Sequence, residues 1–171
     1  MKDRLETTKF VAESLHDLYM TIGDYGEGVK IDVVDVVNKL GGTVYELGYV
    51  DIDGNSMTID ETNGTFNIYV SAMDTEERQR FTIAHELGHY FMHYLPDTSG
   101  KPETKYYRKS YAQGGQIEYE ANVFAASFLM PESKFKQCFE KRKKNLGTVA
   151  EDFGVSIAAA EVRARSLGLL T

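Results

Sequence analysis

The sequence of 171 residues contains one cysteine, Cys138, so it cannot form an intramolecular disulfide. It also lacks any apolar run long enough to cross a bilayer. The first six residues are mostly charged and are not followed by the apolar core of a signal peptide. A chain of this kind suits a reducing compartment, and we expect a cytoplasmic protein with no membrane partner.

Basic residues are outnumbered by acidic ones. The chain has 19 Lys and Arg against 26 Asp and Glu, which gives a formal net charge of −7. This balance argues against a general nucleic-acid-binding surface, although a local basic patch is compatible with it. The length suits a single domain over residues 1–171 with a hydrophobic core of its own.

Histidine occurs only four times, yet three of the four lie in residues 81–93, which contain the motif His-Glu-x-x-His. On an α-helix His85 and His89 are about 40° apart and one turn along, so both imidazoles point to one place. This is the arrangement of two ligands of a tetrahedral zinc ion. Glu86 is turned about 100° from His85, where a general base for the attacking water belongs.

The residues around the motif predict a buried helix. Asp74 is the expected N-cap, with a Glu three residues later, and Pro96 is expected to end the helix. Apolar residues run nearly all round it, which indicates burial, and buried histidines need polar partners. The alternative is histidines that merely pack in the core, but it does not explain why three of them gather here.

A third protein ligand has to come from outside the motif. Residues 117–130 predict a second apolar helix that ends at Pro131 and carries two acids at its start, about 200° apart. Glu118 shares a face with Asn122, which could hydrogen-bond a ligating histidine, so Glu118 is our candidate ligand. Glu120 is expected to point toward solvent or an arginine.

His93 lies one turn beyond His89, and its spacing from His85 is short of that of the metzincin third histidine. We interpret His93 as a residue that supports the site or packs in the core, with direct ligation as the alternative. His16 is expected at the surface or half-buried, without a metal role, because no ligand spacing surrounds it.

The rest of the first half predicts helices over residues 3–22 and 32–40 and strands over 43–47, 56–59 and 65–70. We expect a small twisted sheet packed against the motif helix, whose edge could hold an extended peptide by strand addition. Residues 95–116 are a long irregular stretch. Its section 101–111, basic and rich in tyrosine, could form a lid or substrate rim, and a solvated loop is the alternative.

The C-terminal residues predict three helices. Residues 132–144 are expected to bury Phe135, Cys138 and Phe139, and residues 146–167 resemble a helix-turn-helix. The would-be recognition helix offers Glu161, Arg163 and Arg165 but few Asn or Gln side chains that could read bases. We therefore favour packing over DNA binding for this segment, with direct DNA contact as the alternative.

Three segments together resemble the ImmA/IrrE family of metallo-endopeptidases: residues 80–93 (RFTIAHELGHYFMH), 118–126 (EYEANVFAA) and 129–131 (LMP). The resemblance implies zinc held by the two motif histidines and a glutamate of the following helix, as in thermolysin-type enzymes. Their Glu-x-x-x-Asp pattern is matched here by Glu118 and Asn122, which independently supports Glu118. The resemblance also implies that the target is the repressor of a mobile element, a prophage or a stress response.

The sequence thus predicts an α+β fold, a zinc-metalloprotease-like helical core with a small sheet and a C-terminal helical segment. Within it we distinguish residues 1–72 (helices and sheet), 73–131 (zinc-site helices and the connecting loop) and 132–171. The expected activity is zinc-dependent hydrolysis of a peptide bond in a specific protein, with Glu86 as the general base. The alternative is a zinc-stabilised regulator that acts on a repressor or on DNA without proteolysis.

Overall fold

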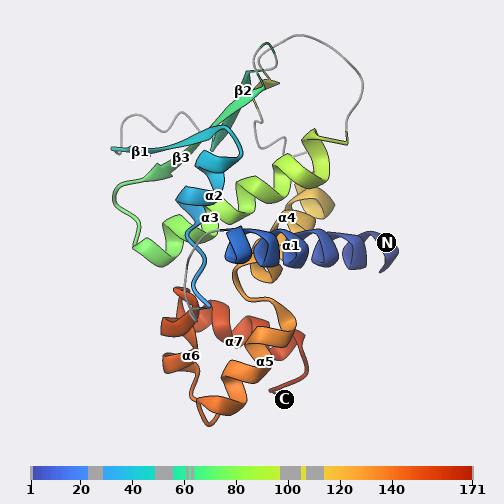
Figure 1. Ribbon diagram of the computed structural model, residues 1–171, viewed down its shortest axis with the longest axis vertical. Coiled ribbons are helices and arrows are strands. Elements are labelled where there is room, and N and C mark those ends of the chain that lie inside the picture. The colour runs from blue at the N-terminus through green and yellow to red at the C-terminus, as the bar shows by residue number, and fades with distance from the viewer. Residues whose placement is uncertain are drawn as a thin grey trace.

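The computed structural model describes residues 2–22, 29–48, 56–60, 62, 64–96, 105–106 and 114–170. The four strands form a sheet at one end, α1 crosses the middle beside α4, and α5 to α7 lie at the other end (Figure 1). This is the expected α+β architecture. The elements are α1 (Lys2–Ile22), α2 (Val33–Lys39), β1 (Gly42–Leu47), β2 (Met57–Asp60), β3 (Thr65–Ser71), α3 (Glu76–His89), the π-helix η1 (Tyr90–Tyr94), β4 (Lys105–Tyr106), α4 (Gly114–Leu129), α5 (Glu132–Lys141), α6 (Leu146–Phe153) and α7 (Ile157–Ser166).

The sheet has the strand order β1-β3-β2-β4, in which β1 and β3 are parallel and the other pairs are antiparallel. The three predicted strands are confirmed, and β4 adds a two-residue strand inside the stretch predicted to be irregular. Along β3, the side chains of Phe66, Ile68 and Val70 are buried while their neighbours are more exposed. This alternation is the period-2 pattern of a strand with one face on the core.

The start and the end of α3 differ from the prediction. Thr75 is the N-cap, because its hydroxyl accepts a hydrogen bond from Arg78 N (3.4 Å). The backbone N–H of Asp74 instead donates to Ser71 O (3.1 Å) in the turn that follows β3, so the expected Asp74 cap is wrong by one residue. The helix changes to π-helical geometry at Tyr90 rather than continuing to Pro96.

Two buried arginines attach the C-terminal helices to the rest of the fold. Arg80 of α3 donates to the carbonyl oxygens of Gly154 (2.9 Å) and Phe153 (3.3 Å), which end α6. Arg163 of α7 donates to Met130 O (2.9 Å) and contacts the Glu13 carboxylate (3.3 Å). Each guanidinium is almost fully buried, where its hydrogen bonds offset the cost of removing a charge from water.

Arg163 therefore does not lie on an exposed face of the helix-turn-helix-like segment, as a base-reading role would require. The segment does have the expected form, because Gly154 ends α6 with a φ of 62° and α7 begins three residues later. A Cβ at Gly154 would lie 2.6 Å from Lys30 Cε and 3.0 Å from Arg80 Nε. Glycine at this turn thus permits both the left-handed backbone and the docking of Arg80.

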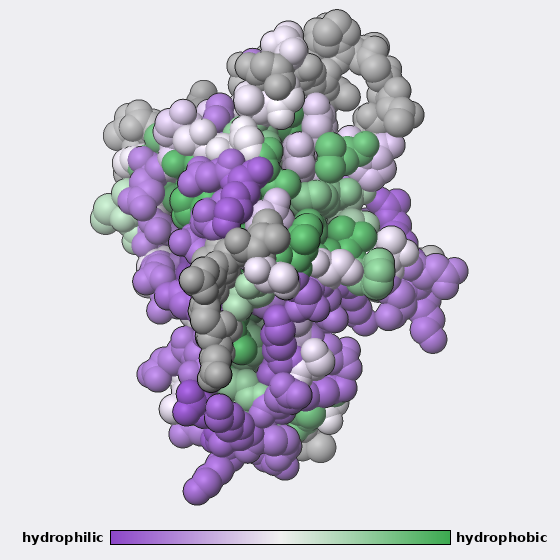
Figure 2. Space-filling model, viewed as in Figure 1, coloured by the Kyte–Doolittle hydropathy of each residue, from purple (hydrophilic) through white to green (hydrophobic). Residues whose placement is uncertain are grey.

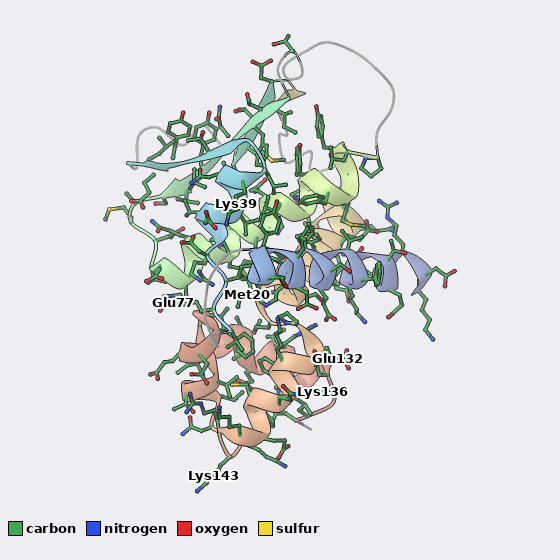
Figure 3. All side chains as sticks on the ribbon, viewed as in Figure 1. Met20, Lys39, Glu77, Glu132, Lys136 and Lys143 are labelled. Carbon is green, nitrogen blue, oxygen red and sulfur yellow. The ribbon has the colours of Figure 1, made fainter. Side chains whose placement is uncertain are left out.

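The outer face of the C-terminal helices, α5 to α7, is charged. Hydrophilic side chains cover much of its visible surface in Figure 2. Glu132 and Lys136 form an i,i+4 ion pair along α5, and Lys143 extends away from the fold at the turn after that helix (Figure 3). Phe135, Cys138 and Phe139 are buried, as predicted. The basic run from residue 141 to 144 is thus a solvated face, the ordinary place for clustered lysines.

The expected position of His16, at the surface or half-buried, is wrong. Its side chain is fully buried, its Nδ1–H donates to Phe128 O (2.7 Å), and its ring meets the Phe128 ring edge-on. A neutral imidazole with a hydrogen-bonded Nδ1 can pack inside a core, which helical periodicity alone does not reveal. Burial, with a smaller effect from the charge of Lys134, lowers the pKa of His16 from 6.5 to about 4.

We expect His16 to make the fold less stable in mild acid. Because its pKa is 6.5 when unperturbed and about 4 in the fold, the unfolded state takes up the proton first. The free energy of unfolding should therefore fall as the pH drops below 6.5, by about 3 kcal/mol in total, and the loss should level off near pH 4. Denaturant titrations of wild type and His16→Gln across this range measure it. Equal pH slopes for the two proteins would contradict the prediction.

Candidate metal centre

A close contact between α3 and α4 builds the site. A Cβ on Gly88, inside the His-Glu-x-x-His motif, would lie 3.1 Å from the Cα and the carbonyl oxygen of Ala121 and from Phe124 Cβ. Glycine at 88 and alanine at 121 let the two backbones approach, since larger side chains would hold them apart. This approach brings the N-terminal half of α4, with Glu118, over the motif histidines.

His85, His89 and Glu118 converge on one place. Their candidate ligand atoms all lie within 4.8 Å of one another. Nε2 of His85 is 3.0 Å from Nε2 of His89, and the two carboxylate oxygens of Glu118 lie 3.3 Å from His85 Nε2 and 3.4 Å from His89 Nε2. Ligands about 2.0–2.1 Å from a tetrahedral zinc ion are about 3.3–3.4 Å from each other. The donor set and its spacing thus suit such an ion.

Asn122 orients one of these histidines. The Nδ1–H of His85 donates to Asn122 Oδ1 (3.0 Å), which leaves Nε2 of His85 as the nitrogen turned toward His89 and Glu118. A hydrogen bond on the far ring nitrogen fixes both the tautomer and the orientation of a metal-ligating histidine. The structure brings Asn122 to the position that we expected from its shared helix face with Glu118.

Glu86 follows His85 in the sequence and lies on α3, with 6% of its surface exposed. A carboxylate so little exposed is unusual unless it has a partner or a function. Glu118 is far more accessible, with 34% of its side chain exposed. Glu86 is thus a buried acid adjoining His85 in the chain, and Glu118 is an accessible acid in contact with both histidines.

Glu120 is buried, so its expected exposure to solvent is wrong, whereas the expected arginine is present. Only 1% of Glu120 is exposed. Its carboxylate accepts hydrogen bonds from Gln116 Nε2 (3.0 Å) and His93 Nε2 (3.1 Å) and pairs with Arg4 Nε (2.8 Å). Burial alone would raise the pKa of Glu120, but the hydrogen bonds and the charge of Arg4 together lower it. Arg4 and Glu120 are far apart in the sequence, so the residue pattern of neither helix indicates this contact.

His93 thus binds Glu120 rather than joining the cluster of His85, His89 and Glu118. The π-helical turn of η1 starts directly after His89, and its wider spacing turns residue 93 away from the line of an α-helix. The rings of His93 and His89 remain neighbours, with centroids 5.3 Å apart. Among the described residues, His85, His89 and Glu118 are the one group of three that could hold a metal.

We expect Glu120→Gln to destabilise the fold but to leave the metal in place. The substitution keeps the size of the side chain and removes the buried charge that pairs with Arg4, which should cost about 1–3 kcal/mol of unfolding free energy. Denaturant unfolding and metal analysis of the purified protein measure the two effects. Arg4→Ala is the control and should cost less, because the Arg4 side chain is half exposed. Loss of the metal from Glu120→Gln would contradict the prediction that Glu120 supports the fold without taking part in metal binding.

The expected lid over residues 101–111 falls outside the described residues, apart from the backbone of 105–106. So do the tyrosine side chains of this section. No helix among the described residues is long and apolar enough to span a membrane.

The fold of this chain is similar to that of a known structure. A search of curated protein sequences gave no match. Among solved structures, a Mycobacterium tuberculosis transcriptional regulator has a similar fold, with a TM-score of 0.63 and 18% sequence identity. The alignment covers 94% of this chain and 48% of that one, so the chain spans about half the length of that protein.

A scan against protein families gave a match to Peptidase_M78, described as the IrrE N-terminal-like domain, over residues 37–165. This range contains α3, α4 and all three residues of the candidate metal-binding cluster, His85, His89 and Glu118. Because the match covers most of the chain, the protein belongs to the IrrE N-terminal-like family of metallopeptidases, the ImmA/IrrE family that its motifs indicated.

Proposed function

We propose that this protein is a zinc-dependent endopeptidase that cuts one peptide bond in a specific protein target. The observation that carries the proposal is the convergence of two histidine nitrogens and a carboxylate within 4.8 Å. The buried acid Glu86, next to His85 in the sequence, supports it. In this assignment His85, His89 and Glu118 hold the zinc ion. A site with three protein ligands leaves a position open, as catalytic zinc sites do and structural ones do not.

The roles of the protein groups follow from their chemistry. When bound, zinc supplies Lewis acidity, which polarises a carbonyl and acidifies water. Glu86 accepts a proton from the attacking water and delivers it to the leaving amine, so one carboxylate serves as base and then as acid. Asn122 keeps His85 in the tautomer whose Nε2 is free of a proton. Gly88 keeps the two ligand-bearing helices close enough to hold this arrangement.

We propose that the target is a helix-turn-helix repressor of a mobile element, a prophage or a stress response. The family supports this choice, and the solved structure with a similar fold is named a transcriptional regulator. One cut can inactivate a repressor and so induce the genes that it controls. A slow and specific protease is sufficient for this task. The acidic chain, with a net charge of −7, is not suited to binding DNA unaided.

The alternative function is a zinc-stabilised regulator that binds a repressor or DNA without cutting. The helix-turn-helix-like shape of α6 and α7 favours it. Against the DNA form of this alternative, the guanidinium of Arg163 is occupied by Met130 O and Glu13 inside the fold, and Arg165 pairs with Glu161. The would-be recognition helix thus has few groups left for base contacts.

The direct test is incubation of the zinc-loaded protein with the helix-turn-helix repressor encoded beside its gene. We expect two fragments from one cut, detectable by mass spectrometry. A chelator should abolish the cut, and one equivalent of zinc should restore it. A repressor that is bound but stays intact under these conditions would support the alternative function.

A further inference from the structure

A second feature lies beside the metal centre, a largely apolar groove of about 710 Å³. Its floor is α4, and its walls are the first half of α1 on one side and α7 on the other. The contributing positions of α4 (residues 119, 122, 123 and 126) follow the i, i+3, i+4 spacing of one helix face, and Met130 directly after the helix continues it. The groove therefore runs along α4 for about 10 Å and extends to Met130.

The sequence explains why this face is hollow. Where α4 and α7 face the groove, several of the side chains are small, among them Ala126, Ala158 and Ala159. Small side chains do not fill the space between these helices, so a channel remains where larger side chains would interdigitate. The groove is distinct from the metal centre, because its volume is lined by none of the three ligand residues.

The groove nevertheless adjoins the metal centre through two residues of α4. Asn122 lines the groove and also hydrogen-bonds His85 Nδ1 (3.0 Å). Tyr119, at the same end of the groove, is the residue directly after Glu118. Because Asn122 borders both features, a polypeptide bound at the metal centre on the His85 side could also contact the groove.

Large apolar side chains stand exposed on the floor helix and on one wall of the groove. Tyr119 on α4 is 55% exposed and Val162 on α7 is 68% exposed. The charges that line the groove are Lys2, Lys9 and the buried Arg163 against Glu6, so this face lacks the acidic excess of the whole chain. Exposed apolar side chains around an apolar groove are typical of a surface that binds an apolar partner. The excess of positive charge along the groove disfavours a basic partner.

We infer that this groove binds an apolar segment of the protein substrate adjacent to the bond that is cut. The inference rests on the proposed function and deepens it, because it assigns substrate selection to α1, α4 and α7. Specificity of this kind comes from side chains remote from the reacting atoms. It also gives the helix-turn-helix-like segment a role in protein recognition, with the exposed Val162 of α7 in contact with the substrate.

The test is the affinity of the zinc-loaded Glu86→Gln protein for the same repressor, measured with and without Val162→Glu. A carboxylate placed among apolar groups that lose water on binding should weaken binding about tenfold or more. The matched control is Ile157→Glu, on the same helix and 58% exposed but not part of the groove. It should change the affinity less than about twofold. Both variants should keep their zinc and their melting temperature.

Each result has a distinct meaning. Equal affinities of Val162→Glu and its parent would overturn the groove inference and leave the proposed function standing, provided that the Glu86-containing protein still cuts the repressor. Absence of both binding and cutting would overturn the proposed function and this inference with it. Concentration-dependent dimerisation that Val162→Glu abolishes, measured by sedimentation without the repressor, would make a second copy of the chain the occupant and would also overturn the inference.

Discussion

The Glu86→Gln variant should bind zinc and its target as the wild type does, yet leave the target uncut. Glutamine keeps the size of the side chain but cannot accept a proton from the attacking water. General-base assistance is worth about 10²–10⁴-fold in rate, so a slow protease should yield no visible fragments over hours. The measurement pairs zinc content and target affinity with a time course of cleavage.

Glu77→Gln is the matched control for this variant, because Glu77 lies in the first turn of the same helix, more than two turns from the motif. It removes the same charge and should cut the repressor at the wild-type rate. If Glu86→Gln regulates the repressor as well as the wild type does, peptide-bond hydrolysis is not how this protein acts. The non-proteolytic regulator would then be the better account of the site.

The second large effect is expected on metal affinity. His85→Ala, His89→Ala and Glu118→Ala each remove one of three ligand groups and should weaken zinc binding by more than roughly 100-fold. Asn122→Ala removes only the hydrogen bond that orients His85, for which a loss of about 10–100-fold is usual. Competition with a chelator of known affinity measures all four proteins, and circular dichroism shows whether each is folded.

Glu120→Gln serves as the control in this series, because its carboxylate lies two residues from Glu118 but is occupied by Arg4, His93 and Gln116. It should keep the zinc affinity of the wild type. Retention of zinc by Glu118→Ala, together with loss from a Glu120 variant, would reverse the assignment of the third ligand. The same measurement thus decides between the two acids that the sequence offers on α4.

The periodic patterns in the sequence were enough to predict the motif helix, the strand over residues 65–70 and the pairing of the two motif histidines. The i,i+4 spacing of His85 and His89 needs only a helix to bring two imidazoles together, and alternation in residues 65–70 needs only a strand to bury Phe66, Ile68 and Val70. The apolar runs that end near Pro96 and Pro131 marked both helices of the site. The motifs also sufficed to indicate the family, which a match over residues 37–165 confirms.

Tertiary contacts decided the rest, because they join residues that are far apart in sequence. The close approach of Gly88 to Ala121, where an added Cβ would lie only 3.1 Å from the Ala121 backbone, sets which face of α4 meets the histidines. The ion pair of Glu120 with Arg4, 116 positions earlier, and the hydrogen bond of His16 to Phe128 bury polar groups that a periodic pattern assigns to solvent. Periodicity reports the direction of a side chain from its own helix, whereas burial depends on which other helix covers that direction.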